Sequence, residues 1–201
     1  MGAPPVLAPP SRPDTSGGRR PTRGGWATVA VVATILVVVL GGYVVAAVLS
    51  EPVGPPIGIP GVVGVRPLSG WVGADTAVPF EGAPSFQLTR GNGNLIVSVL
   101  EPYRDDPATL ADAYRGFLSN RLSQLSVSST LEPIRLRSGQ VGVRFTYIGV
   151  AADSGTSVEG EVTVLVTPSG HGIVFNGWAP AGLLSFVRSD VRTMVAEAEV
   201  T

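Results

Sequence analysis

The sequence predicts an α+β domain in which an antiparallel β-sheet packs against two helices, preceded by one transmembrane helix. Two long segments, 140–150 and 157–167, alternate apolar and polar residues, as strands do in an antiparallel sheet with one face in solvent. The turns AADSG and PSGHG join the later strands, and such short connections imply antiparallel pairing. The segments 107–125 and 182–200 instead repeat apolar residues every three or four positions, which is typical of amphipathic helices.

The remaining elements follow from turn and capping signals. The turn RGNGN (90–94) separates two predicted strands, 85–89 and 95–101, and the second strand is apolar on both faces, which indicates a central position in the sheet. Asp106 is a good N-cap for the first helix, and Pro107 suits its first position. Further strands are predicted at 131–137 and 173–178, so that the element order is ββ–α–ββββ–α.

The N-terminal part of the chain predicts a membrane anchor. Residues 24–50 carry no charge, and about 20 apolar residues suffice to cross a bilayer core, so 26–49 is the predicted transmembrane helix. Residues 1–25 are rich in Pro and Gly and are predicted to be a disordered tail. This tail carries one acid, Asp14, and four bases: Arg12, Arg19, Arg20 and Arg23. The arginines place the tail in the cytoplasm and the folded domain outside it.

An alternative is a cleaved signal peptide, with Val45, Ala46 and Ala47 as the small residues of a cleavage site. The apolar run is longer than a signal peptide requires, which favours an uncleaved anchor, and both interpretations place the domain outside the cytoplasm. The segment 50–64 is punctuated by Pro and Gly and is predicted to be an extended linker. The folded extracytoplasmic domain is then 65–201.

Composition excludes several classes of function. The chain has 201 residues, a formal net charge of −1 and no basic excess, so nucleic acid is not an expected partner. It contains no cysteine, which rules out disulfides, thiol nucleophiles, cysteine metal sites and a lipid-modified N-terminal cysteine. The turn RGNGN lacks the glycine–lysine–hydroxyl sequence of a phosphate-binding loop, so nucleotide binding is not expected.

The single histidine, His171, raises the question of catalysis. It lies between two glycines at a predicted hairpin tip, where such residues serve backbone geometry, and we interpret it as a solvated turn residue. A hydrolase would require a Ser or Asp hydrogen-bonded to His171 and a pocket beside it. Calcium could use Glu159 and Glu161, but Arg144 on the neighbouring strand could offset these carboxylates. We therefore predict no catalytic residue, no metal site and no cofactor.

Recognition of a ligand or a protein partner is the class of function that remains after these exclusions. The large aromatic side chains that could line a cleft are Trp71, Tyr103, Tyr147 and Trp178, although each could equally be part of the core. The leading hypothesis is a non-enzymatic binding or accessory module of the cell envelope with a protein partner. The alternative is a carrier or sensor of a lipid or small molecule held between sheet and helix. A cleft among the aromatic residues would favour the carrier, and a filled core with an exposed apolar patch would favour the protein partner.

Several of these motifs together resemble PsbP-like domains, the fold of the PsbP subunit of photosystem II and of actinobacterial LpqN-type secreted proteins. The resemblance covers 62–201 and rests on VRPLSGW (65–71), GQVGVRFTYIG (139–149), GEVTVLV (160–166) and the final helix ending VRTMVAEAEV (191–200). No catalytic signature defines this family, so the resemblance implies a binding or accessory role without a defined ligand. The metal-binding residues of the photosynthetic members have no matching motif here.

Overall fold

The computed structural model describes residues 54–74 and 80–201. The predicted tail (1–25) and transmembrane helix (26–49) lie outside the described residues. Among residues 54–74 and 80–201, no helix is long and apolar enough to cross a membrane. In chain order the elements are β1 (Ile57–Ile59), β2 (Val63–Val65), β3 (Val72–Ala74), the short turn η1 (Phe80–Gly82), β4 (Ser85–Arg90), β5 (Gly93–Leu100), α2 (Pro107–Arg121), β6 (Leu122–Val127), β7 (Glu132–Arg135), β8 (Val141–Ala151), β9 (Ser157–Val166), β10 (Gly172–Pro180), α3 (Leu184–Ala196) and β11 (Glu199–Val200).

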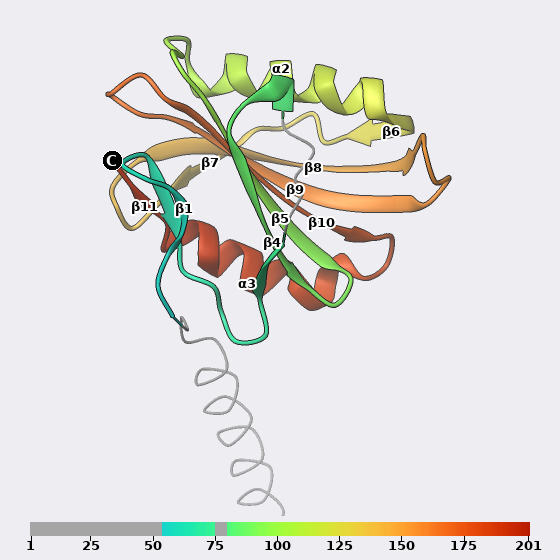
Figure 1. The fold of residues 1–201 in the computed structure, drawn as a ribbon. Coiled ribbons are helices and arrows are strands. Elements are labelled where there is room, and N and C mark those ends of the chain that lie inside the picture. Colours follow the sequence, from blue (N-terminus) through green and yellow to red (C-terminus); the bar gives the residue numbers. More distant parts are fainter. Residues whose placement is uncertain (1–53, 75–79) are drawn as a thin grey trace, which may run out of the picture. The chain divides into compact units, whose positions relative to one another are not determined.

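The larger of two described sheets contains eight strands, all paired antiparallel. Its strand order is β3-β4-β5-β10-β9-β8-β6, and β7 also pairs with β8. Helix α2 lies over one face and α3 over the other (Figure 1). The predicted α+β class, with an antiparallel sheet and two helices, is therefore confirmed for the described part of the chain. The central position predicted for the strand at 95–101 is also confirmed, because β5 pairs on both sides.

Helix α2 begins where the sequence predicts. The Oδ1 atom of Asp106 accepts a hydrogen bond from the backbone N–H of Thr109 at 2.8 Å, and Pro107 occupies the first turn. This N–H bond lowers the pKa of the Asp106 carboxyl below its usual range, because it stabilises the ionised form. Leu110, Tyr114 and Leu118 bury the inner face of the helix against the sheet.

The end of this helix differs from the prediction. The apolar repeat continues to Leu125, but α2 ends at Arg121 and Leu122–Val127 forms the edge strand β6. The pairing of β6 with β8 changes register around Gln124, whose φ of 51° marks a bulge. The prediction of helix as far as residue 125 is wrong because the edge of β8 offers backbone hydrogen bonds to this segment, which local periodicity does not reveal.

Side chains of the sheet alternate between two cores. On the α3 side, Leu95, Val97 and Phe175 pack with α3, and on the α2 side, Phe145 and Val162 pack with α2. The polar face predicted to be solvated on the strands at 140–150 and 157–167 requires a correction. Glu161 and Thr163 on β9 are each only 3% exposed, because α3 and its side chains cover this face.

The predicted linker also requires a correction. Within 50–64, the strand β1 pairs with β2, and Ile57 lies opposite Val65. The C-terminal strand β11 adds to the other side of β2, which makes a second, three-stranded sheet. The Pro and Gly content favours an extended backbone and concealed the short hairpin of β1 and β2, and the third strand, β11, lies far along the chain. The folded region therefore begins before residue 65.

Candidate functional site

Helix α3 approaches the sheet closely because two glycines lie beneath it. A Cβ atom at Gly93 would lie 2.7 Å from Cγ1 of Val187, and one at Gly177 would lie 2.5 Å from Cγ1 of Val191. Val187 and Val191 are one helical turn apart, so these two glycines on β5 and β10 accept successive turns of the helix. This seating determines which α3 side chains reach the sheet and which remain in solvent.

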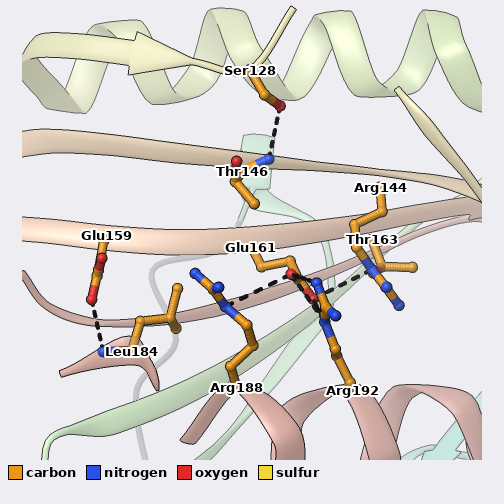
Figure 2. Close-up of polar contacts among 9 residues, drawn as sticks. All are labelled: Ser128, Arg144, Thr146, Glu159, Glu161, Thr163, Leu184, Arg188 and Arg192. Atoms are coloured by element: carbon orange, nitrogen blue, oxygen red, sulfur yellow. Dashed lines mark hydrogen bonds and ion pairs between the residues drawn. The ribbon is translucent and has the colours of Figure 1, made fainter. Parts of the chain in front are cut away.

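One flank of α3 meets a buried carboxylate on β9. Glu161 is 3% exposed, and Arg192 donates to it from Nε (2.8 Å to Oε1) and from Nη2 (2.6 Å to Oε2) (Figure 2). The Nε atom of Arg144 on β8 lies 3.3 Å from Oε1, as the sequence predicts, and it is also 3.3 Å from the hydroxyl of Thr163. The hydrogen bonds to Glu161 raise the pKa of Arg192, because they stabilise its charged form.

Arg188 belongs to the same cluster but is bound less tightly. Its Nε atom is 4.0 Å from Oε2 of Glu161 and, among the described residues, has no hydrogen-bond partner although it is buried. The remainder of its side chain reaches solvent, with 42% exposed. Sequence reasoning missed Arg188 and Arg192. Their spacing of four residues on a helix would have placed them on one face, but not above Glu161.

Glu159, the second carboxylate on this strand face, stabilises the start of α3. Its Oε1 atom accepts hydrogen bonds from the backbone N–H groups of Gly182 (3.0 Å) and Leu184 (2.8 Å), and Figure 2 shows the bond to Leu184. The side chain of Leu183, at the N-cap position, makes no capping hydrogen bond, so the carboxylate of Glu159 on β9 caps the helix instead. Within 54–74 and 80–201, no three His, Asp or Glu side chains converge as metal ligands.

The opposite flank of α3 carries an exposed apolar site. Asp190 accepts a hydrogen bond from Nε1 of Trp71 at 3.0 Å and pairs with Arg90, which ties this flank to the β3–β5 end of the sheet. Beside this contact lies a cleft of about 290 Å³. Phe186 at its rim is 76% exposed, the most exposed large apolar side chain among the described residues. The cleft is lined by Arg90, Gly91, Asn92, Gly93, Leu183, Phe186 and Val187.

The four predicted aromatic binding residues are not brought together. Trp71 is 4% exposed and packs in the core on the α3 side. Tyr147 is 6% exposed on the α2 side, where its hydroxyl donates to Oδ1 of Asn176 at 3.1 Å, and burial raises the pKa of Tyr147. Tyr103 and Trp178 are half-buried against that same core. Neither of the two clefts described is lined by any of the four, so a role for them in binding stays a prediction.

His171 makes more contacts than a solvated turn residue would. Its side chain is only 12% exposed, its Nδ1 lies 3.0 Å from the hydroxyl of Ser169, and its Nε2 lies 3.4 Å from the carboxylate of Glu101. The expected turn position is correct, since His171 lies between β9 and β10. Ser169 donates to the backbone oxygen of Thr201, and neither cleft is lined by Ser169 or His171. A serine within hydrogen-bond distance of His171, the first feature that a hydrolase would require, is therefore present. The second feature, a pocket beside His171, is not found among the described clefts.

Comparisons with known proteins concern the fold. No protein-family model and no curated protein matches the chain. Similar solved structures include LpqN of Mycobacterium tuberculosis, described as involved in cell envelope biogenesis (16% identity, 73% of this chain and 90% of that chain, TM-score 0.49). They also include cyanobacterial PsbP from Synechocystis sp. PCC 6803 (17%, 69% and 86%, TM-score 0.47) and the Ran-binding protein Mog1p of Saccharomyces cerevisiae (14%, 75% and 96%, TM-score 0.46). LpqN and PsbP are of the fold family that the sequence resembles.

Proposed function

We propose that this chain is a membrane-anchored module of the cell envelope that binds a protein partner through its extracytoplasmic domain and catalyses no reaction itself. The observation that carries the proposal is the apolar cleft with Phe186 at its rim. Complete burial of such a side chain contributes about 1.5–3 kcal/mol, and nothing in the described fold uses Phe186 for its own core. An exposed aromatic side chain next to an apolar cleft is the kind of surface that a protein partner covers.

The core supports a protein partner over a carried lipid. Phe80 packs edge to face on Tyr114 and Phe117, with ring centroids 5.0 and 5.1 Å apart. Tyr147 is buried in the same core on the α2 side. The space between sheet and α2 is therefore filled by side chains, whereas a carrier needs a cleft there.

The membrane anchor supports the location of the module. Residues 24–50 carry no charge and follow an arginine-bearing segment, which favours a single span with the N-terminus in the cytoplasm. The domain is then presented outside the cytoplasm, where the partner is a membrane or secreted protein of the envelope.

The test is site-specific photocrosslinking of the full chain in native membranes. A photoreactive phenylalanine analogue at position 186 should give one predominant protein adduct, and Phe186→Ser should lower the amount of that partner co-purified with the chain by about tenfold. Val141→Ser is the matched control, because Val141 is also an exposed apolar residue (50%) but lies on β8, and it should leave recovery unchanged. Adducts with lipid alone, or equal recovery with both variants, would overturn the proposal.

A further inference from the structure

The flank of α3 opposite Phe186 carries more cationic donors than Glu161 satisfies. A carboxylate offers about four acceptor positions, whereas each guanidinium group carries five N–H donors. Arg192 already makes three hydrogen bonds to Glu161, and Nε of Arg144 lies 3.3 Å from its Oε1 atom. One bidentate arginine suffices to neutralise a buried carboxylate, so Arg188 is not required for that purpose.

Arg188 and Arg192 approach the same carboxylate from one face of α3. They lie four residues apart on α3, which separates their Cβ atoms by about 5–6 Å on one helix face. Their side chains are 42% and 45% exposed, while the Nε atoms of both are directed toward Glu161. Glu161 thus binds Nε and Nη2 of Arg192 and lies 4.0 Å from Nε of Arg188, so that Nη1 of Arg192 and both Nη groups of Arg188 have no hydrogen-bond partner among the described residues. The buried Nε–H of Arg188 lacks an acceptor in the described structure, an arrangement that is costly unless something offsets it.

The surface beside these arginines is open. Helix α3 packs over β5, β10 and β9, and β8 beyond it exposes Ile148 (45%) on the same face. Thr146 lies opposite Glu161 on β8. The arginines therefore reach into a strip between α3 and β8 (Figure 2).

We propose that Arg188 and Arg192 bind a phosphate group in the strip between α3 and β8, with Glu161 as the residue that positions them. This site lies about half a helical turn around α3 from Phe186 and does not depend on the proposed protein partner. Guanidinium N–H groups match the oxygen atoms of phosphate, and the Nη groups that Glu161 leaves free on two neighbouring arginines suit a compact group that carries more than one charge.

The nearby acids limit the strength of the site. Glu159 is committed to the backbone N–H groups of Gly182 and Leu184, and Glu132 acts on Arg192 from β7. We therefore expect weak binding that is sensitive to salt, as for other exposed charges.

The test uses the full chain in an uncharged maltoside detergent, titrated with inorganic phosphate at constant ionic strength and followed by the width of the phosphorus NMR line. Binding should saturate, and Arg188→Gln should weaken it by at least about tenfold, because charge-assisted hydrogen bonds are lost. Arg66→Gln is the matched control, because Arg66 is equally exposed (50%) and also paired with a glutamate. Arg188→Gln should keep the melting temperature of the parent, because Arg188 makes no hydrogen bond to Glu161.

A second arm distinguishes the source of the phosphate. The chain is reconstituted in phosphatidylcholine nanodiscs with or without phosphatidic acid. If inorganic phosphate binds equally well in both kinds of disc, the site is assigned to a free phosphate compound. If phosphatidic acid in the disc abolishes the Arg188-dependent binding of inorganic phosphate, the site is assigned to a lipid headgroup. Three results would overturn the proposal. They are binding that does not saturate, equal affinity of Arg188→Gln and the parent for phosphate, and Arg188-dependent binding of a glutamate-rich peptide that phosphate does not displace.

Discussion

At the scale of single residues, Glu161 explains why α3 carries arginines toward the sheet. A carboxylate that is 3% exposed requires charged partners, and Arg192 on α3 and Arg144 on β8 provide them. The ion pair between Arg192 and Glu161 also helps to orient the helix. On the opposite flank, Asp190 is hydrogen-bonded to Trp71 and paired with Arg90. These two sets of polar contacts hold α3 in one rotation about its axis.

Removal of the Glu161 charge should therefore destabilise the domain. In Glu161→Gln the arginines face a neutral amide, and we expect the free energy of unfolding to fall by about 3 kcal/mol, as when one partner of a buried ion pair is removed. The measurement is chemical denaturation of variant and parent. The control is Glu199→Gln, which removes an exposed pair with Arg66 and should cost no more than about 1 kcal/mol. Equal losses from the two substitutions would contradict this prediction.

The cap of α2 predicts a pH dependence. The pKa of Asp106 is lowered in the folded state, so its contribution is complete above the pKa of the unfolded chain and is lost as pH falls through the folded pKa. Asp106→Ala should lower the melting temperature at neutral pH, and the difference from the parent should shrink in acid. Asp106→Asn keeps an acceptor without the charge, so it should retain much of the neutral-pH stability. A difference from the parent that stays constant with pH would show that the carboxylate charge plays no part.

At the scale of elements, the seating of α3 on Gly93 and Gly177 positions both flanks of the helix. The cleft at Phe186 and the arginines at Glu161 lie on the same helix, so a shift of α3 alters both. The close approach is possible only without a Cβ atom on the sheet at these two positions.

We expect Gly177→Ala to displace α3 and to destabilise the domain by about 1–3 kcal/mol, because the new methyl group overlaps Val191. Gly116→Ala is the control: Gly116 lies within α2 with no atom near the added Cβ, and this substitution should stabilise by about 0.5–1 kcal/mol. Thermal and denaturant unfolding measure both. A Gly177→Ala domain as stable as the parent would show that the contact relaxes without cost.

At the scale of the whole molecule, the described domain combines a small sheet of β1, β2 and β11 with the eight-stranded sheet and its helices. The proposed anchor at 26–49 would display this domain outside the cytoplasm. The chain has no cysteine, so a single introduced cysteine reports on topology without background.

The topology prediction uses two such variants of the full chain. Ser154→Cys, in the exposed loop between β8 and β9, should react with a membrane-impermeant maleimide in intact cells. Ser11→Cys, in the predicted cytoplasmic tail, should react only after the membrane is permeabilised. The reverse pattern would refute the predicted orientation, and absence of the Ser11→Cys segment from the mature chain would show that the apolar run is a cleaved signal peptide.

Much of the element order follows from the sequence because it rests on local signals. Asp106 and Pro107 mark the start of α2, and the alternation at 140–150 and 157–167 marks β8 and β9, because caps and strand periodicity act within a few residues. Arg144 could be matched to Glu161 because β8 and β9 form a hairpin, in which Arg144 lies diagonally across from Glu161 on the same face of the sheet. The edge strand β6 escaped because its helical periodicity hid its pairing with β8, and the small sheet escaped because β1 and β2 are short and their third strand, β11, lies far along the chain.

The sequence by itself determined the fold class, the cap of α2 and the hairpin of β8 and β9, because these depend on short-range periodicity and on the backbone preferences of individual residues. Only the tertiary structure decided the site. Arg188 and Arg192 read as ordinary solvent-facing positions on a helix, and Phe186 as one apolar residue among many. Their roles depend on which turn of α3 lies over Gly93, Gly177 and Glu161, and that placement arises from close packing between segments far apart in the chain.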